Sequence, residues 1–182
     1  MTSRTSTLER DTRETKVSVK LNIDGDGKFN VVTDVPFLTH MIETFARYAS
    51  FDIELSATGD NEHHIVEDAA ITLGIAFKNA IGDAPVERTA TVTIPMDDAL
   101  VTVSLDIIDR PFADIDSADR LYQHFFRSFA MSAGLTLHIV KLRGFDDHHV
   151  TEASFKALGK ALKQASVPRK TELSTKDKAR VS

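Results

Sequence analysis

The 182-residue chain contains no cysteine, and it has no apolar run long enough to cross a bilayer. The absence of cysteine excludes disulfides, thiolate metal sites and cysteine nucleophiles, so a bound metal would need nitrogen and oxygen ligands. The first ten residues contain no apolar segment typical of a secretory signal, and we therefore expect a cytoplasmic protein without a membrane partner. The formal net charge of −5 argues against a nucleic-acid partner, since such proteins usually carry a basic excess.

Apolar residues make up 42% of the chain and charged residues 27%, which is typical of a globular domain. Alternating apolar residues predict a half-buried strand at Val17–Ile23. The segment Asp24–Gly27 is typical of a hairpin turn, because Gly and Asp tolerate positive φ, and we expect Phe29–Thr33 to be the returning strand. An EF-hand loop is excluded, since its last ligand position is Val35. A helix over 37–49, a strand over 51–55 and a helix over 63–80 follow.

The second half of the chain repeats this order of strand, strand, helix, strand and helix. The expected strands cover 92–96, 101–107 and 135–140, and the expected helices cover 117–133 and 148–165. Residues 63–80 and 148–165 are identical at eight of eighteen positions, including both histidines, the glutamate and a Leu-Gly pair. We therefore predict an α+β fold built by tandem duplication of a ββαβα unit, with pseudo-twofold-related halves at 12–84 and 86–168 and a tail at 169–182.

Each repeat carries a His-His-x-x-Glu motif on its second helix and one further histidine on its first. These residues are His40, His63, His64 and Glu67 in the first half, and His124, His148, His149 and Glu152 in the second. The first histidine and the glutamate of each motif are four residues apart, so they share a helix face and can hold one ion. The second histidine points about 100° away and is better placed to reach another ion. Six imidazoles and two carboxylates suit two ions such as Mn²⁺, Fe²⁺, Ni²⁺ or Zn²⁺.

These motifs belong to a series of matching segments that runs along nearly the whole chain. The longest are GDNEHHIVEDAAITLG (59–74) and DHHVTEASFKALGKAL (147–162), with FLTHM (37–41), HFFRSFA (124–130) and Ser174-Thr175-Lys176 among the others. In these segments the chain resembles the imidazoleglycerol-phosphate dehydratase family. The resemblance implies a fold like that of ribosomal protein S5 domain 2. It also implies that D-erythro-imidazole-glycerol phosphate loses water to give imidazole-acetol phosphate in histidine biosynthesis.

The resemblance further implies two Mn²⁺ ions on the eight ligands named above, at sites completed between subunits of a 24-subunit homo-oligomer. The proton to be lost sits on a carbon without an adjacent carbonyl, so the imidazole ring must accept the electrons, and ions on its nitrogens would stabilise the imidazolate. By the same resemblance, Glu14 is the catalytic proton-transfer group. The implied substrate contacts are Glu14, Arg88, Arg110, Ser174, Thr175 and Lys176, so the tail at 169–182 contributes to the phosphate site.

Two other functions fit the same ligands. One is a different dinuclear metalloenzyme that acts on a small phosphorylated substrate, and the other is a protein that metal ions assemble without catalysis. The cations Arg88, Arg110 and Lys176 favour a phosphorylated substrate. A coordinatively closed metal site, insensitive to an added imidazole or triazole ligand, would instead indicate the structural protein.

Overall fold

The computed structural model describes residues 4–117, 119–171 and 173. Its first half contains β1 (Thr5–Asp11), β2 (Thr15–Asn22), β3 (Phe29–Thr33), α1 (Pro36–Ala49), β4 (Asp52–Gly59) and α2 (Glu62–Ile81). Its second half contains β5 (Thr89–Met96), β6 (Ala99–Ile107), β7 (Phe112–Ile115), α3 (Arg120–Ala133), β8 (Leu135–Arg143) and α4 (Asp147–Ala165). The two halves therefore have the same order of elements, which confirms the predicted duplication and the α+β class.

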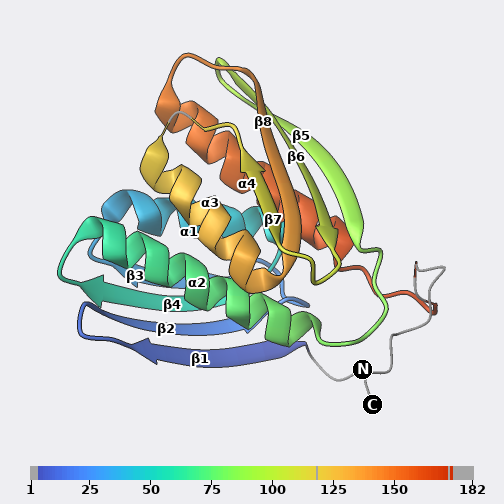
Figure 1. Ribbon diagram of the computed structural model, residues 1–182, viewed down its shortest axis with the longest axis horizontal. Helices are drawn as coiled ribbons and strands as arrows, with labels where there is room; N and C mark the ends of the chain where they lie inside the picture. Colours follow the sequence, from blue (N-terminus) through green and yellow to red (C-terminus); the bar gives the residue numbers. More distant parts are fainter. Residues whose placement is uncertain (1–3, 118, 172, 174–182) are drawn as a thin grey trace.

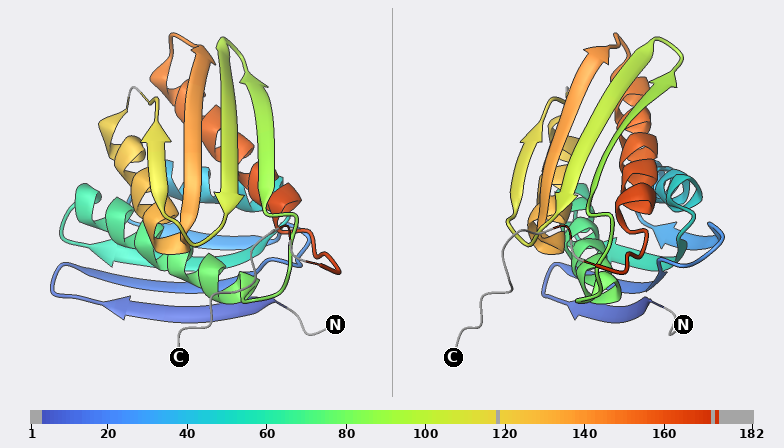
Figure 2. Two further views of the ribbon diagram at one scale, coloured as in Figure 1. Left: turned by 45° about the vertical axis from the view of Figure 1, so that its right-hand side comes forward. Right: turned by 90° about the vertical axis from the view of Figure 1, so that its right-hand side faces the viewer.

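The strands form two four-stranded sheets with one topology, in the orders β1-β2-β4-β3 and β5-β6-β8-β7. In each sheet the second strand is antiparallel to both of its neighbours, and the last pair, β3 with β4 or β7 with β8, is parallel. Helices α1 and α2 pack on the first sheet, and α3 and α4 pack on the second. The helices thus lie between the two sheets (Figures 1 and 2).

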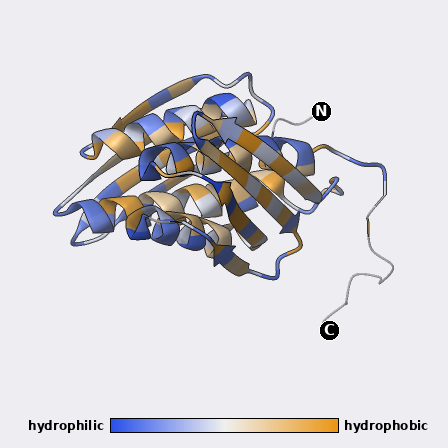
Figure 3. Ribbon diagram, turned by 90° about the horizontal axis from the view of Figure 1, so that it is seen from above, coloured by the Kyte–Doolittle hydropathy of each residue, from blue (hydrophilic) through white to orange (hydrophobic). Residues whose placement is uncertain are grey.

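The alternation of apolar and polar residues explains which face of each sheet is covered. Strand β2 buries Val17, Val19 and Leu21 while the residues between them are exposed, and β6 alternates between buried and half-buried residues. Figure 3 shows this alternation as bands of hydropathy along the strands. Each buried aliphatic side chain of this size contributes about 2 kcal/mol to folding. The core is therefore formed where the apolar sheet faces meet the helices.

Two strands were absent from the sequence prediction. Strand β1 contains one apolar residue, Leu8, and buries none of its residues fully, so hydrophobic periodicity does not reveal it. Strand β7 has only four residues and follows Pro111, in a segment for which neither a strand nor a helix was expected. Each repeat is therefore βββαβα rather than ββαβα.

The predicted hairpin between β2 and β3 was also wrong. Strand β4 lies between them, antiparallel to β2 and parallel to β3. The connection is anchored to β4, because the Asp52 carboxylate accepts the backbone N–H groups of Asp26 and Lys28 at 3.0 and 2.9 Å. The Gly and Asp residues of this connection therefore carry the chain across the end of β4. Their tolerance of unusual backbone angles suits such a crossing as well as a hairpin. The predicted turn at Asp97-Asp98 does join antiparallel neighbours, β5 and β6.

The helices of the two repeats pair crosswise, α2 with α3 and α1 with α4. The glycine of each Leu-Gly pair makes this approach possible. A Cβ on Gly74 would lie 2.7 Å from the backbone oxygen of Phe129, and a Cβ on Gly159 would lie 2.9 Å from that of Phe45. Within the described residues no helix is long and apolar enough to cross a membrane. The cytoplasmic location stays a prediction.

Candidate active site

Both His-His-x-x-Glu motifs lie in the first turns of their helices, where side-chain caps fix the backbone. The Asn61 side chain accepts the backbone N–H of His64 at 3.1 Å, and the Asp146 carboxylate accepts that of His148 at 2.8 Å. Asx side chains are favoured at this position because they satisfy N–H groups that have no partner within the helix. The caps therefore set the position at which each motif begins.

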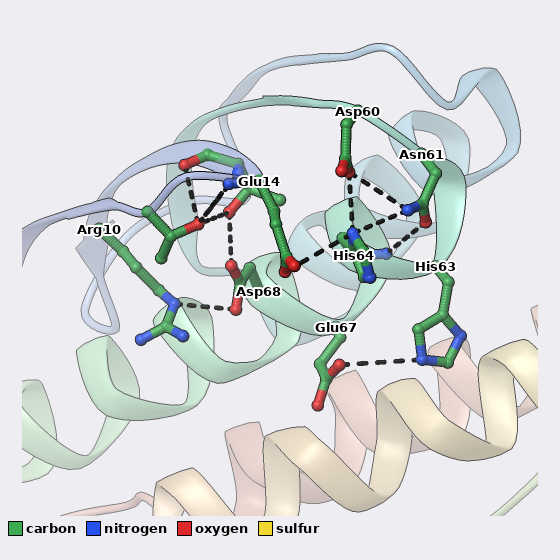
Figure 4. A network of polar contacts seen from close by, with 10 residues as sticks. Arg10, Glu14, Asp60, Asn61, His63, His64, Glu67 and Asp68 are labelled. Carbon is green, nitrogen blue, oxygen red and sulfur yellow. Dashed lines mark hydrogen bonds and ion pairs between the residues drawn. The ribbon is translucent and has the colours of Figure 1, made fainter.

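The first motif forms a compact triad with a histidine from the other repeat. Nε2 of His63 lies 3.8 Å from Oε2 of Glu67, and Nε2 of His124 lies 3.1 Å from Oε1 of Glu67. The rings of His63 and His124 stack at 5.0 Å, and one ligand atom from each of the three residues lies within 4.8 Å of the others. Figure 4 shows His63 and Glu67 pointing toward one another.

One atom of this triad indicates what the three residues could hold. Nε2 of His124 is buried and makes no hydrogen bond of acceptable geometry, although the Glu67 oxygen is close. A buried nitrogen without a hydrogen bond is costly unless another group uses its lone pair. Two imidazoles and a carboxylate are donors that Mn²⁺ and similar ions accept. The triad therefore fits a divalent transition metal.

The second motif brings together the corresponding three residues, with Glu152 buried and both histidines exposed; among the described residues, only the first triad has ligand atoms that all lie within 4.8 Å of one another. Nε2 of His40 and Nε2 of His148 lie 3.6 and 3.3 Å from the same oxygen, Oε2 of Glu152. The other oxygen, Oε1, accepts a hydrogen bond from Nζ of Lys156 at 2.8 Å. Burial opposes ionisation, but the Lys156 ammonium and the two imidazoles outweigh it and hold the pKa of Glu152 below its usual value. Glu152 thus stays an ionised, buried carboxylate and a candidate ligand.

Each single histidine therefore joins the motif of the opposite repeat: His124 joins the first motif, and His40 joins the second. The crosswise helix pairs place them there, because α3 packs on α2 and α1 packs on α4. Spacing along the chain gave no information about this exchange. The structure thus places each single histidine beside the motif of the opposite repeat.

The second histidines of the two motifs turn away from these triads. Nδ1 of His64 lies 2.8 Å from Asp60 and 3.6 Å from Oε2 of Glu14. Nδ1 of His149 lies 2.5 Å from Asp98. The hydrogen bond to Asp60 raises the pKa of His64, and the one to Asp98 raises the pKa of His149. The divergence agrees with the helical geometry, and the role of both residues as ligands of another ion stays a prediction.

The β5–β6 turn is itself held firmly. Backbone N–H donation from Phe145, together with the His149 side chain, lowers the pKa of Asp98 to about 2. The N–H of Asp146 also donates to this carboxylate, at 3.2 Å. Asp98 therefore stays ionised and orients His149.

The residues expected at the phosphate lie elsewhere. Arg88 donates to the Asp106 carboxylate through Nε at 2.7 Å, and its Nη1 donates to the backbone oxygen of Leu173 at 3.0 Å. Arg110 is exposed. Ser174, Thr175 and Lys176 lie outside the described residues. The contact with Leu173 nevertheless brings the chain that leads to them beside Arg88.

Within one chain, the phosphate and metal candidates lie at opposite ends of the helices. Lys78, near the end of α2, pairs with Asp109 at 2.5 Å, and Arg110 follows directly. His63 lies fifteen residues before Lys78 on the same helix, which corresponds to about 22 Å. Arg88 likewise donates its backbone N–H to Ala165, the last residue of α4, whereas His148 lies near the first. One chain therefore does not bring these residues together.

Comparison with known proteins identifies the family. The model of the imidazoleglycerol-phosphate dehydratase family matches residues 33–162. The chain belongs to this family. It is 46% identical over 178 residues to the imidazoleglycerol-phosphate dehydratase of Saccharolobus solfataricus, covering 90% of this chain and 92% of that protein. The corresponding protein of Caldanaerobacter subterraneus subsp. tengcongensis is 46% identical over 176 residues, covering 89% and 91%.

Solved structures agree with this assignment. A crystal structure of the dehydratase (IGPD) from Pyrococcus furiosus superposes with a TM-score of 0.84 at 36% identity, covering 92% of this chain and 98% of that chain. Membership of the family confirms three predictions from the sequence: the family itself, the duplicated fold and the enzyme class, a hydro-lyase. The site residues, the metal and the oligomer stay predictions.

Several residues of the described site were missed from the sequence, among them Asp60 and Asp98, which contact the second histidines, and also Lys156 and Asp68. Lys156 contacts Glu152, and its spacing of four residues after that glutamate was the available signal. Asp68 is a buried acid directly after Glu67, and neither its burial nor its partners could be read from spacing.

Proposed function

We propose that this dehydratase converts D-erythro-imidazole-glycerol phosphate to imidazole-acetol phosphate, with two Mn²⁺ ions held by the eight motif ligands. The observation that carries the proposal is the pair of crosswise triads, each with two imidazoles and a carboxylate, one of which contains the buried, unbonded Nε2 of His124. When bound, Mn²⁺ would supply Lewis-acid stabilisation of negative charge on the imidazole ring.

Glu14 is proposed as the proton-transfer group. It lies in the turn between β1 and β2, with Oε2 3.6 Å from Nδ1 of His64, so a ligand near the first motif would be within its reach. Figure 4 shows its carboxylate pointing toward His64. We expect Glu14→Gln to lower turnover by about 10²–10⁴-fold with metal still bound. Near-normal turnover of a metal-loaded variant would remove Glu14 from the mechanism.

Arg88, Arg110, Ser174, Thr175 and Lys176 are proposed to bind the phosphate of the substrate. Because Arg110 and His63 lie at opposite ends of α2, these contacts would come from a neighbouring subunit. This separation supports sites shared between subunits, as we expect in a homo-oligomer of 24 subunits. A guanidinium suits a phosphate because it offers forked, charged donors.

Mixed assemblies test the shared site. A Glu67→Gln subunit has an impaired metal end, and an Arg110→Ala subunit has an impaired phosphate end. If sites are shared between subunits, co-assembled mixtures regain activity above either parent, because some sites combine two intact ends. Each variant taken alone through the same assembly procedure is the control. Mixtures no more active than the parents, in particles shown to contain both subunits, would contradict the shared site.

The metal requirement is tested on the substrate itself. We expect the dehydration of imidazole glycerol phosphate to stop after chelation and to return when Mn²⁺ is added. Metal analysis should then find two ions for each set of eight ligands. Absence of activity after Mn²⁺ is restored, in a protein shown to be assembled, would overturn the proposal.

A further inference from the structure

The buried acid Asp68 has no part in the proposed chemistry, yet it contacts the segment that carries Glu14. We infer that Asp68 is a positioning residue, which clamps the β1–β2 turn to α2 and thereby holds Glu14 against His64. This inference rests on the proposed role of Glu14. It assigns a purpose to a carboxylate that is neither a candidate metal ligand nor within the phosphate site.

Both carboxylate oxygens of Asp68 are used by the two strands that flank the turn. Nε of Arg10, at the end of β1, donates to Oδ1 at 2.8 Å. The hydroxyl of Thr15, the first residue of β2, donates to Oδ2 in a close hydrogen bond. Asp68 is 8% exposed and Thr15 is 4% exposed, so the bond between them is shielded from water, whereas the bond from Arg10 is only partly buried. Figure 4 shows Asp68 reaching from α2 toward Arg10 on one side and the turn on the other.

Hydrogen bonds to the backbone of Glu14 connect it to the residues that Asp68 holds. Oγ1 of Thr12 accepts the N–H of Glu14 at 3.2 Å and that of Thr15 at 3.0 Å. The backbone oxygen of Glu14 accepts the N–H of Asp60 at 3.0 Å. Asp60 in turn bonds His64. Glu14 is therefore held between the Asp68 clamp and the loop that orients its imidazole partner.

Helical geometry separates Asp68 from the metal triad. Successive residues of a helix project about 100° apart, so Asp68 and Glu67 leave α2 in different directions. Glu67 faces His63 and His124, whereas Asp68 faces β1 and β2. One turn of α2 thus places a candidate ligand on one side and the anchor of the catalytic turn on the other.

The second repeat indicates that the fold alone does not require this anchor. Ala153 stands in α4 where Asp68 stands in α2, and the same sheet and helix arrangement forms around it. There the β5–β6 turn has only two residues, Asp97 and Asp98. The Asp98 carboxylate itself accepts the backbone N–H groups of Phe145 and Asp146. The longer β1–β2 turn, which carries Glu14, has the separate carboxylate instead. The carboxylate at this helix position is thus present in the repeat that carries Glu14 and absent from the other repeat.

Loss of the clamp should reduce turnover more than substrate binding, because a reacting group displaced by about 1 Å can lose about 10² in rate. We expect Asp68→Ala to lower kcat by about 100-fold with little change in KM. Metal content and assembly should remain unchanged. In a Glu14→Gln background, Asp68→Ala should add almost no further loss, since Asp68 acts through Glu14.

A gentler pair of variants removes the same contact without emptying the site. Thr15→Val deletes the hydroxyl that bonds Asp68 at nearly constant volume, and Thr15→Ser retains it. We expect kcat to fall in Thr15→Val and to be largely kept in Thr15→Ser. Thr72→Val is the matched control, because it removes a buried hydroxyl on α2 that bonds the backbone oxygen of Asp68 rather than its carboxylate. It should affect stability but leave kcat unchanged.

The outcomes separate the inference from the proposed function. An inactive Glu14→Gln with a fully active Asp68→Ala overturns the clamp and leaves the role of Glu14 standing. Losses that multiply in the double variant overturn it as well, because Asp68 would then act independently. If excess Mn²⁺ restores Asp68→Ala, the residue supports Glu67 instead. A normally active Glu14→Gln overturns both ideas. If Asp68→Ala does not fold, equal kcat in Thr15→Val and Thr15→Ser overturns the clamp.

Discussion

The two repeats bring together the same three residue types in different electrostatic surroundings, and among the described residues only the first set has ligand atoms that all lie within 4.8 Å of one another. In the first, Glu67 faces the imidazoles of His63 and His124. Four residues after it, where the second repeat has a lysine, stands the apolar Ile71. In the second, Glu152 is more buried and shares its carboxylate with the ammonium of Lys156. A repeated ligand pattern therefore does not produce two equivalent sites, because residues outside the pattern set the local charge.

The largest expected effect comes from deleting either glutamate. Glu67→Ala and Glu152→Ala should each lose one metal ion and about 10³ in activity, since Lewis-acid stabilisation is worth several kcal/mol. Only Glu152→Ala should also lower the free energy of unfolding of the chelated protein, by about 3 kcal/mol, because the half-buried Lys156 ammonium loses its carboxylate partner and keeps only the weaker contacts with Met96 and the Tyr48 ring. Metal analysis and chemical denaturation measure the two quantities.

The control for this difference is the double variant Glu152→Ala/Lys156→Met, in which the charge pair is removed together. It should recover most of the lost stability and none of the activity. Equal stability of Glu67→Ala and Glu152→Ala would show that Lys156 does not distinguish the repeats.

A smaller effect is expected where the repeats are most alike. Gly74→Ala and Gly159→Ala should each destabilise the protein by about 1–3 kcal/mol, because the new methyl group meets the backbone of the facing helix. Each substitution should loosen one triad only, measured as a weaker Mn²⁺ affinity at that site. If either variant is instead more stable, as a glycine replaced in an unconstrained helix would be, the close approach is not required.

The smallest effect concerns the turned-away histidines in the chelated protein. Asp98→Asn should lower the pKa of His149 toward its ordinary value, while the pKa of His64, which Asp60 raises, stays unchanged. A histidine whose pKa is raised by folding stabilises the folded state fully at pH values below its ordinary pKa. This stabilisation is lost as the pH rises through the raised pKa of the folded state. That loss should be smaller in Asp98→Asn. Imidazole NMR titration and unfolding at several pH values test this, and an unshifted His149 would contradict it.

Sequence patterns located the helices well and the strand pairing poorly. Helix α2 was expected at 63–80 and covers Glu62–Ile81, because a long apolar period and an Asx cap mark it locally. The pairing of β3 with β4 was missed because Asp24–Gly27 carries the same residues whether it closes a hairpin or crosses a strand. Strand β1 was missed because its exposed and half-buried positions are almost all polar, so no apolar period marks it.

The sequence by itself determined the duplication and the family and supplied the candidate ligands, because these depend on residue identity and spacing alone. Only the tertiary structure decided that His124 serves the first motif and His40 the second, since helix packing brings together residues from opposite repeats. It also decided that Lys156 shares Glu152, that Asp68 anchors the Glu14 turn, and that Arg110 lies far from His63 in one chain. Such contacts depend on how distant segments pack, and local spacing carries no record of that packing.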